Sequence, residues 1–338
     1  MKKSINRFIY FVYYIKKLDY PKFSKFLAFA SIAANRSKFA ILSDVFFSVF
    51  KYNIGILDYF YFMFYEKDKN ERSRWAGTGF MYEYHLRMNP KKSRHLLENK
   101  IEFLNNYSEF VKRDFADIET LKRNTGKASE LLDNPTGKIV LKLSGGQVGA
   151  EVKFYDSKSF TNDSLVEEMK RHNFDLAEEY VVQHPALMAL SPSGLNTVRI
   201  FTQLEGERVL FLGARLRISV NSQVDNLGAG NIAAPLDITT GKVTGPGVYS
   251  DITKQDEAIH PITCQPIEGF QVPFWNETIT MVKEASLLNP ENRSIGWDIA
   301  ITATGPELIE GNHNWCKLLW QLPVKQGLKP MIQKYMLS

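Results

Sequence analysis

Residues Gly296–Trp315 read GWDIAITATGPELIEGNHNW and have the pattern of a β-hairpin. Apolar residues alternate with other residues along Ile299–Ala303, as they do in a half-buried strand. Thr304–Pro306 is Thr-Gly-Pro, a typical turn sequence, and Leu308 begins a second apolar segment. The pattern predicts two antiparallel strands joined by a short turn.

Three oxygen-bearing side chains lie on the two arms of this hairpin. Asp298 is on the first arm, and Glu310 and Asn312 are on the second. Residues two apart on a strand point to the same face, and pairing across the hairpin can bring Asp298 beside the other two. Two carboxylates and an amide oxygen form a cluster that Mg²⁺ prefers, completed by water and phosphate oxygens. The alternative is a surface hairpin with solvated acids.

The composition is that of a globular protein. The chain has 338 residues, of which 44% are hydrophobic, enough for two or three lobes with ample core. Cys264 and Cys316 are its two cysteines. They make neither a disulfide framework nor a zinc site, so a reducing cytoplasm is expected.

The charge is unevenly distributed along the chain. Residues 1–70 contain 12 Lys or Arg and 5 Asp or Glu, a net charge of +7, and the remainder carries −2. The part with catalytic-looking motifs is therefore not basic, and no nucleic-acid groove is expected.

Two aromatic runs lie in the basic N-terminal segment, Phe8–Ile15 and Ile54–Tyr65. Both are too short for a membrane-spanning helix, and no small-residue cleavage site follows the first, so no signal peptide is expected. The first interpretation is a set of helices packed on the main body. The alternative is a basic, aromatic face that rests on an anionic bilayer.

A glycine-rich loop follows in the middle of the chain. It is preceded by a polar segment at 76–98, which we expect to be irregular, and by a predicted helix at Arg113–Leu132. The predicted strand at Lys138–Leu143 then leads into Ser-Gly-Gly-Gln-Val-Gly, and another predicted strand follows. Glycines allow backbone N–H groups to close around phosphate oxygens, and Lys142 could add a cation. The alternative is a tight hairpin.

The second half of the chain reads as strands followed by one helix. Glu178–Pro185 reads as a strand that ends at the proline, and Trp275–Leu288 reads as a helix. The alternating strand at Val209–Val220 carries Arg215 and Arg217 on one face. Buried arginines need an anionic partner, which a phosphate, a carboxylate substrate or structural acids would supply.

The order of these elements resembles that of the ATP-grasp superfamily. Four strings, NTVRIFT, DNLGAGNIAAPLDITTGKV, HPITCQPIEGFQVPFW and GWDIAIT…ELIEGN, resemble more narrowly the sugar-transfer-associated ATP-grasp family, whose neighbour is the teichuronopeptide-type ATP-grasp family. The resemblance covers residues 99–325 or so.

The resemblance implies an α+β, ATP-grasp fold. A helical, aromatic and basic region at 1–98 would precede an N-terminal lobe at 99–180 and a C-terminal lobe at 181–338. The two α+β lobes would clasp ATP between them, and the second would carry the metal-binding hairpin.

The resemblance also implies roles for individual residues. Arg199 and Arg217 would contact the γ-phosphate or an acyl-phosphate and are the catalytic candidates. Mg²⁺ would be held by Asp298, Glu310 and Asn312. One departure is Gln183, where ligases of this superfamily often have Glu. The residues implied to bind ATP are Lys100, Lys142, Ser144, Gly145, Gly146, Gly149, Val181, Val182 and Gln183.

The activity implied is that of an ATP-dependent carboxylate–amine ligase. It would form an acyl-phosphate and then an amide between a uronic acid and an amino acid or amino sugar, in capsule or O-antigen polysaccharide biosynthesis. The substrates would be small, sugar-linked molecules, and the enzyme would be cytoplasmic, with peripheral contact to the inner face of the membrane through residues 1–65. The alternatives are a kinase of a sugar or lipid-linked sugar, a non-catalytic nucleotide-binding module, and a glycosyltransferase partner or membrane scaffold.

Overall fold

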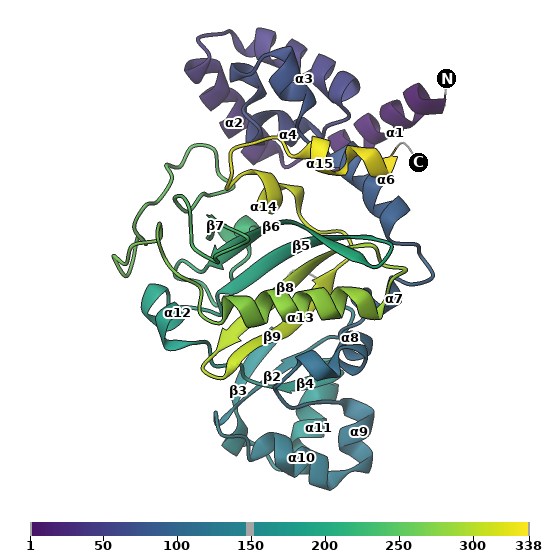
Figure 1. The fold of residues 1–338 in the computed structure, drawn as a ribbon, viewed down its shortest axis with the longest axis vertical. Helices are drawn as coiled ribbons and strands as arrows, with labels where there is room; N and C mark the ends of the chain where they lie inside the picture. Colours follow the sequence, from purple (N-terminus) through teal and green to yellow (C-terminus); the bar gives the residue numbers. More distant parts are fainter. Residues whose placement is uncertain (1, 147–151, 337–338) are drawn as a thin grey trace.

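The computed structural model describes residues 2–146 and 152–336 in three parts along the long axis of the molecule (Figure 1). A group of helices at one end is followed by a five-stranded sheet in the middle and a four-stranded sheet at the other end. Gly149, predicted to bind ATP, lies outside the described residues.

The N-terminal helices form their own core. Asp19 and Ser37 cap two of them by accepting hydrogen bonds from the N–H groups of Lys22 and Ala40. The second aromatic run is buried in this core, which includes Tyr59, Phe60, Phe62 and Phe64, so this run packs as the first interpretation expects. The helices are α1 (Lys2–Lys16), α2 (Tyr20–Ala33), α3 (Lys38–Tyr52), α4 (Ile56–Tyr61), η1 (Phe64–Glu66) and α5 (Lys69–Ser73).

The segment expected to be irregular contains a helix, α6 (Thr78–Met88), so this expectation was wrong. The apolar side chains of Phe80, Tyr84 and Met88 pack against the large sheet and the C-terminal helices. Helices in proteins owe most of their stability to such tertiary packing, which the local sequence does not show. Two short helices, α7 (His95–Glu98) and α8 (Lys100–Asn106), and the 3-10 turn η2 (Ser108–Phe110) lead to the small sheet.

The small sheet is antiparallel, with the order β1-β4-β2-β3. Its strands are β1 (Phe115–Asp117), β2 (Lys138–Lys142), β3 (Val152–Asp156) and β4 (Leu176–Glu179). The predicted helix at Arg113–Leu132 is interrupted: β1 is followed by α9 (Ile118–Arg123) and α10 (Thr125–Leu132), each capped by its own Asp or Asn. These helices and α11 (Asn162–Arg171) share one core with the sheet.

The large sheet has the order β7-β6-β5-β8-β9, and every pairing in it is antiparallel. Its strands are β5 (Thr197–Glu205), β6 (Arg208–Ile218), β7 (Ile232–Leu236), β8 (Ser294–Thr302) and β9 (Gly305–Asn312). The predicted hairpin is thus confirmed as β8–β9, the two strands nearest the small sheet (Figure 1).

The two faces of the large sheet differ in chemistry. One face packs against α13 (Trp275–Leu288), the predicted helix, through residues such as Val198, Ile200 and Trp297. The other face carries Arg199 and Asp298, which are register partners. It is therefore the second face, at the edge nearest the small sheet, that can carry polar chemistry.

The C-terminal segment returns to the N-terminal helices (Figure 1). It contains α14 (Lys317–Gln321), α15 (Lys329–Gln333) and the 3-10 turn η5 (Lys334–Met336), while α12 (Pro185–Leu190) lies between the two sheets in the chain. No helix in the described ranges has the length and apolar character that crossing a membrane requires.

Candidate functional site

The β8–β9 hairpin brings the three predicted oxygen ligands together. Asp298 and Glu310 are register partners, and Asn312 pairs with Gly296, which precedes Asp298 by two residues on β8. Asn312 Nδ2 donates a hydrogen bond of 3.1 Å to Glu310 Oε1. A bulge next to Asp298 locally alters the alternation of the strand. The juxtaposition predicted from the sequence is therefore present.

Close packing behind this hairpin explains the glycine at position 296. A Cβ atom at Gly296 would lie 2.6 Å from Cβ of Trp315, closer than side chains approach one another. Trp315 is buried against Phe201 and Trp320. The residues that follow Asn312 therefore anchor the hairpin in the core.

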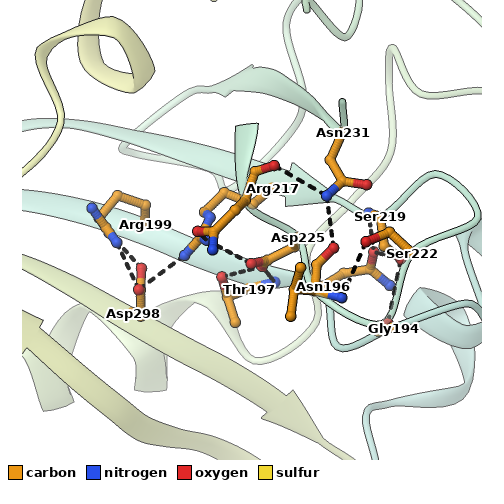
Figure 2. Close-up of polar contacts among 12 residues, drawn as sticks. Gly194, Asn196, Thr197, Arg199, Arg217, Ser219, Ser222, Asp225, Asn231 and Asp298 are labelled. Atoms are coloured by element: carbon orange, nitrogen blue, oxygen red, sulfur yellow. Dashed lines mark hydrogen bonds and ion pairs between the residues drawn. The ribbon is translucent and has the colours of Figure 1, made fainter. Parts of the chain in front are cut away.

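Two arginines converge on Asp298 (Figure 2). Arg199 donates through Nε to Oδ1 and through Nη2 to Oδ2, the latter at 2.6 Å, and Arg217 Nη1 lies 2.9 Å from Oδ2. Arg217 Nη2 also lies 2.6 Å from Oδ1 of Asp225, whose other oxygen accepts from the N–H and hydroxyl groups of Thr197. The predicted catalytic arginines thus lie at the predicted metal ligands.

The charges in this cluster shift the pKa values of its acids. Burial opposes the ionisation of Asp298, but Arg199 and Arg217 outweigh it and hold the pKa of Asp298 far below its usual range. Burial and then the charge of Asp298 raise the pKa of Glu310. One carboxylate is therefore fully compensated, and its neighbour is not.

This donor set fits Mg²⁺. The ion takes one or two carboxylates together with substrate phosphate oxygens, and a cation near Glu310 would act against the burial and the Asp298 charge that raise the pKa of Glu310. No cluster of three or more His, Cys, Asp or Glu side chains suited to a metal occurs in residues 2–146 and 152–336. A metal here would therefore depend on the Asn312 amide and on phosphate oxygens as well.

The two predicted lysines lie near this hairpin. Lys100 begins α8, and its Nζ donates to the carbonyl oxygens of Leu143 and Gly146 at 3.2 and 2.5 Å. Burial lowers the pKa of Lys100, the nearby Glu310 opposes this shift, and Lys142 adds to it. The charge of Lys100 therefore interacts with those of Glu310 and Lys142.

Lys142 has a partner that the sequence did not reveal. Its Nζ lies 2.7 Å from Oε2 of Glu178, a buried residue of β4. Glu178 also lies 2.9 Å from Nε of Arg113, and Arg113 Nη1 lies 3.0 Å from Glu307 of β9. Arg113 therefore ties the small sheet to the large one directly beside the site.

The described part of the glycine-rich segment is anchored at its start. Ser144 donates from its N–H and hydroxyl groups to Asp175, at 2.6 and 2.5 Å. A Cβ atom at Gly145 would meet no atom of the described residues within 4 Å. The segment up to Gly146 is held by Asp175 and Lys100, and its exposed glycine leaves room for a ligand.

The predicted adenine contacts divide into two kinds. The side chain of Gln183 donates to the carbonyls of Ser191 and Gly194 at 3.2 and 3.0 Å and accepts from the N–H of Asn196 at 3.0 Å. Its hydrogen bonds are therefore used within the protein. Val182 is 52% exposed, and its N–H has no acceptor among the described residues. The strand expected here ends earlier, at Glu179.

Arg215 corrects the expectation that both arginines of β6 need an anionic partner. Its guanidinium donates from Nε to the carbonyl of Trp320 at 3.1 Å and from Nη1 to that of Ala214. Burial lowers the pKa of Arg215 to about 9. It holds the end of α14, and only Arg217 and Arg199 take part in the acidic cluster.

Four charged residues at the site were not singled out from the sequence. Asp225 had a usable signal, because it lies in the glycine-containing loop after β6 and Arg217 required an anion. The others have no local signal, because their partners are 31 to 194 residues away. They are Arg113, Asp175 and Glu178.

Comparisons with known proteins add family and fold neighbours. A family model described as sugar-transfer associated ATP-grasp matches residues 80–336, well over half of the chain. No curated protein matches it in sequence.

Three solved structures illustrate the structural similarities. The ATP-grasp ligase PsnB with its minimal precursor is 14% identical, with 74% of this chain and 62% of that chain covered and a TM-score of 0.41. The biotin carboxylase domain of Hydrogenobacter thermophilus 2-oxoglutarate carboxylase, with MgADP and bicarbonate, is 14% identical, with 74% of this chain and 52% of that chain covered and a TM-score of 0.43. The L-amino acid ligase from Bacillus licheniformis is 14% identical, with 70% of this chain and 49% of that chain covered and a TM-score of 0.40. The chain spans about half to two thirds of their length.

Proposed function

Because the chain belongs to the sugar-transfer associated ATP-grasp family, we propose that it is an ATP-dependent carboxylate–amine ligase. One observation carries the proposal. Asp298, Glu310 and Asn312 share one end of the β8–β9 hairpin, and the charge of Lys100 interacts with those of Glu310 and Lys142. An acidic cluster facing two lysines is what binding of a metal–nucleotide complex requires.

The reaction proceeds in two steps. The carboxylate of one substrate attacks the γ-phosphorus of ATP, forming an acyl-phosphate and releasing ADP. The amine of the second substrate then attacks the acyl carbon, phosphate leaves with the electrons of the C–O bond, and the amine loses a proton. Activation is needed because hydroxide is a poor leaving group, and phosphate is a good one.

The arginines suit the anionic groups of both steps. Arg199 and Arg217 together carry two positive charges around Asp298, and Arg217 forms a second ion pair with Asp225. In this proposal they contact the γ-phosphate and the acyl-phosphate, because fixed donors in a buried site stabilise such charge strongly. Asp298, Glu310 and Asn312 would hold Mg²⁺, which supplies charge neutralisation on the phosphates.

The nucleotide is held by the small sheet and the segment after β4. Lys100 and Lys142 would neutralise phosphate charge, and the loop predicted at Gly145–Gly149, of which the structure describes Gly145 and Gly146, would cover the phosphates. The backbone of Val181–Val182 contacts the adenine edge, which is supported by the N–H of Val182, because it has no acceptor within residues 2–146 and 152–336. Gln183 acts by shaping this segment, because its own hydrogen bonds are used within the protein.

The proposed substrates are sugar-linked. A uronic acid supplies the carboxylate and an amino acid or amino sugar supplies the amine, in assembly of a capsule or O-antigen polysaccharide. The description of the family as sugar-transfer associated supports this choice. We place the helical region at residues 1–98, the first lobe at 99–180 and the second at 181–338.

The enzyme is proposed to act in the cytoplasm, with peripheral contact to the inner face of the membrane through residues 1–65. The first aromatic run supports this contact, because Phe11 and Tyr14 pack against the core while other members of the run stay exposed. Phe8, Ile9 and Tyr13 are 60%, 57% and 57% exposed.

The decisive experiment traps the activated carboxylate. Purified protein is incubated with ATP, Mg²⁺, a panel of uronic acids and hydroxylamine, and the products are read by mass spectrometry. A hydroxamate with equimolar ADP is expected, and omission of the uronic acid should stop ADP formation. A stable phosphomonoester would favour the kinase instead, and nucleotide binding without turnover on any acid or amine would favour the non-catalytic module.

A further inference from the structure

An open pocket of about 890 Å³ lies on the N-terminal helical region, at the opposite end of the molecule from the small sheet (Figure 1). It is formed between α3 and the segment that leads into α5. None of the residues discussed at the candidate active site lines it. Its charged lining residues are Arg36, Asp44, Lys67, Asp68, Lys69 and Arg72.

The pocket carries surplus positive charge. Its four basic residues face two carboxylates, and both carboxylates are already engaged. Asp44 accepts from Arg72 at 2.8 and 2.9 Å and from Arg36 at 3.1 Å. Asp68 caps α5 by accepting from the N–H groups of Asn70 and Glu71. The charged lining residues therefore carry a net charge of +2, and the ammonium groups of Lys67 and Lys69 form no ion pair with any described residue.

Helix α3 presents two neighbouring outward faces beside the pocket. One face, at helical spacing, lines the pocket and ends at Phe47, which is 55% exposed. The adjoining face exposes Phe39, Leu42 and Phe46, at positions i, i+3 and i+7. A third face, which includes Ile41 and Val45, is buried. The cationic pocket and an apolar stripe therefore adjoin on the solvent side of one helix.

Helix α1 extends the apolar stripe. The ring of Phe11 lies 5.4 Å from that of Phe46 and 5.2 Å from that of Phe50. Around this contact, α1 exposes Phe8, Val12 and Ile15. The first 18 residues of the chain contain five basic residues and no acidic one. Large apolar groups exposed next to unbalanced positive charge mark an interaction surface.

We propose that this pocket binds the phosphate-bearing headgroup of an anionic phospholipid, while the apolar stripes of α3 and α1 enter the interfacial layer of the same bilayer. The proposal deepens the membrane contact proposed above and rests on it. A second copy of the chain fits less well, because it would bring two basic surfaces together. An amphipathic, basic and aromatic surface is typical of interfacial binding.

The test measures partition of the full chain onto vesicles of phosphatidylcholine with and without phosphatidylglycerol. We expect binding only to the mixed vesicles, weakened by salt. Lys67→Gln/Lys69→Gln should lower the partition on the order of tenfold, because each basic residue adds to attraction by an anionic surface. Phe39→Ser/Phe46→Ser should lower it comparably. The matched control, Lys158→Gln/Lys283→Gln, removes two exposed lysines elsewhere and should bind like the wild type.

The outcomes separate the two proposals. If the wild type does not bind the mixed vesicles, both membrane contact and headgroup binding are overturned. If it binds, but the Lys67/Lys69 variant binds equally well, the pocket proposal alone is overturned. A dimer in vesicle-free solution that Phe39→Ser/Phe46→Ser dissociates would assign the stripe to a second copy instead. ADP formation without vesicles should be the same in every variant, which keeps this test independent of the ligase reaction.

Discussion

Glu310 is the acid whose substitution reports most directly on the metal site. It has no ion pair among the described residues, and its pKa is raised by burial and then by Asp298. We expect Glu310→Gln to lower Mg²⁺-dependent ADP formation by roughly 100-fold or more, with little change in the melting temperature. Metal titrations of ADP release and thermal unfolding measure the two effects. ADP formation at the wild-type rate in the folded variant would contradict the assignment of Glu310 as a metal ligand.

Asp298 has a structural duty in addition to the proposed metal role. Asp298→Asn would leave Arg199 without its carboxylate, and Arg217 would keep Asp225 and the side-chain oxygen of Asn226. Loss of one member of a buried ion cluster costs about 3–5 kcal/mol, so this variant should lose both activity and stability. Urea unfolding beside Glu310→Gln tests this difference, and equal stability of the two variants would contradict it.

Glu178 should make the stability of the protein sensitive to acid. Burial opposes its ionisation, but Arg113 and Lys142 outweigh burial and lower its pKa to about 2. Because this folded-state pKa lies below the ordinary value of 4.5, the stabilisation is complete above about pH 4.5 and is lost as the pH falls towards 2. A shift of this size corresponds to about 3 kcal/mol.

The check is urea unfolding of Glu178→Gln from pH 7 to pH 3. The variant should be less stable at pH 7 and should lose less stability on acidification than the wild type. Glu284→Gln, an exposed acid on α13, serves as the control and should follow the wild type. Parallel pH profiles for wild type and Glu178→Gln would show that the shift is absent.

Among the elements, the turn between α12 and β5 depends on one glutamine. Gln183 holds the carbonyls of Ser191 and Gly194 and the N–H of Asn196. Gln183→Met removes the acceptor of the Asn196 N–H and one donor to each of the two carbonyls, at about 1–3 kcal/mol, and should change the KM for ATP much less than stability. Gln333→Met, at an exposed position of α15, is the control. A large rise in KM without loss of stability would assign Gln183 to the nucleotide instead.

At the scale of the whole molecule, the C-terminal helices join the helical region to the large sheet. Gln321 of α14 accepts from the N–H groups of Ala76 and Leu328 and donates to the carbonyl of Ala76. Lys317 lies 3.0 Å from the buried Asp58. Because these contacts cross between the parts, residues 1–75 should unfold together with the sheets.

Calorimetry of the full chain should therefore show one cooperative transition. Gln321→Leu should move this single transition to lower temperature without splitting it, because buried groups of Ala76 and Leu328 lose their partner. Two separate transitions, the first of them absent from a chain beginning at residue 76, would show that the helical region is an independent domain.

Several features of this protein follow from its sequence alone. The β8–β9 hairpin, the helix at Trp275–Leu288 and the strand before the glycine-rich segment were all predicted, and so was the meeting of Asp298 with Glu310. Each depends on side-chain periodicity, on turn residues or on pairing within about 15 positions, so neighbouring residues carry the whole signal. The family resemblance rests on the same short strings, and it is confirmed.

Other features were decided only by the tertiary structure. Helix α6 forms where the sequence reads as irregular, and of the two aromatic runs only the second is buried. Arg215 takes a backbone carbonyl where an acid was expected, Gln183 turns inward, and Arg113 joins the two sheets. Burial and charge pairing join residues that the chain keeps far apart. Which partner a buried polar group finds, and which apolar run stays exposed, depends on how the elements pack.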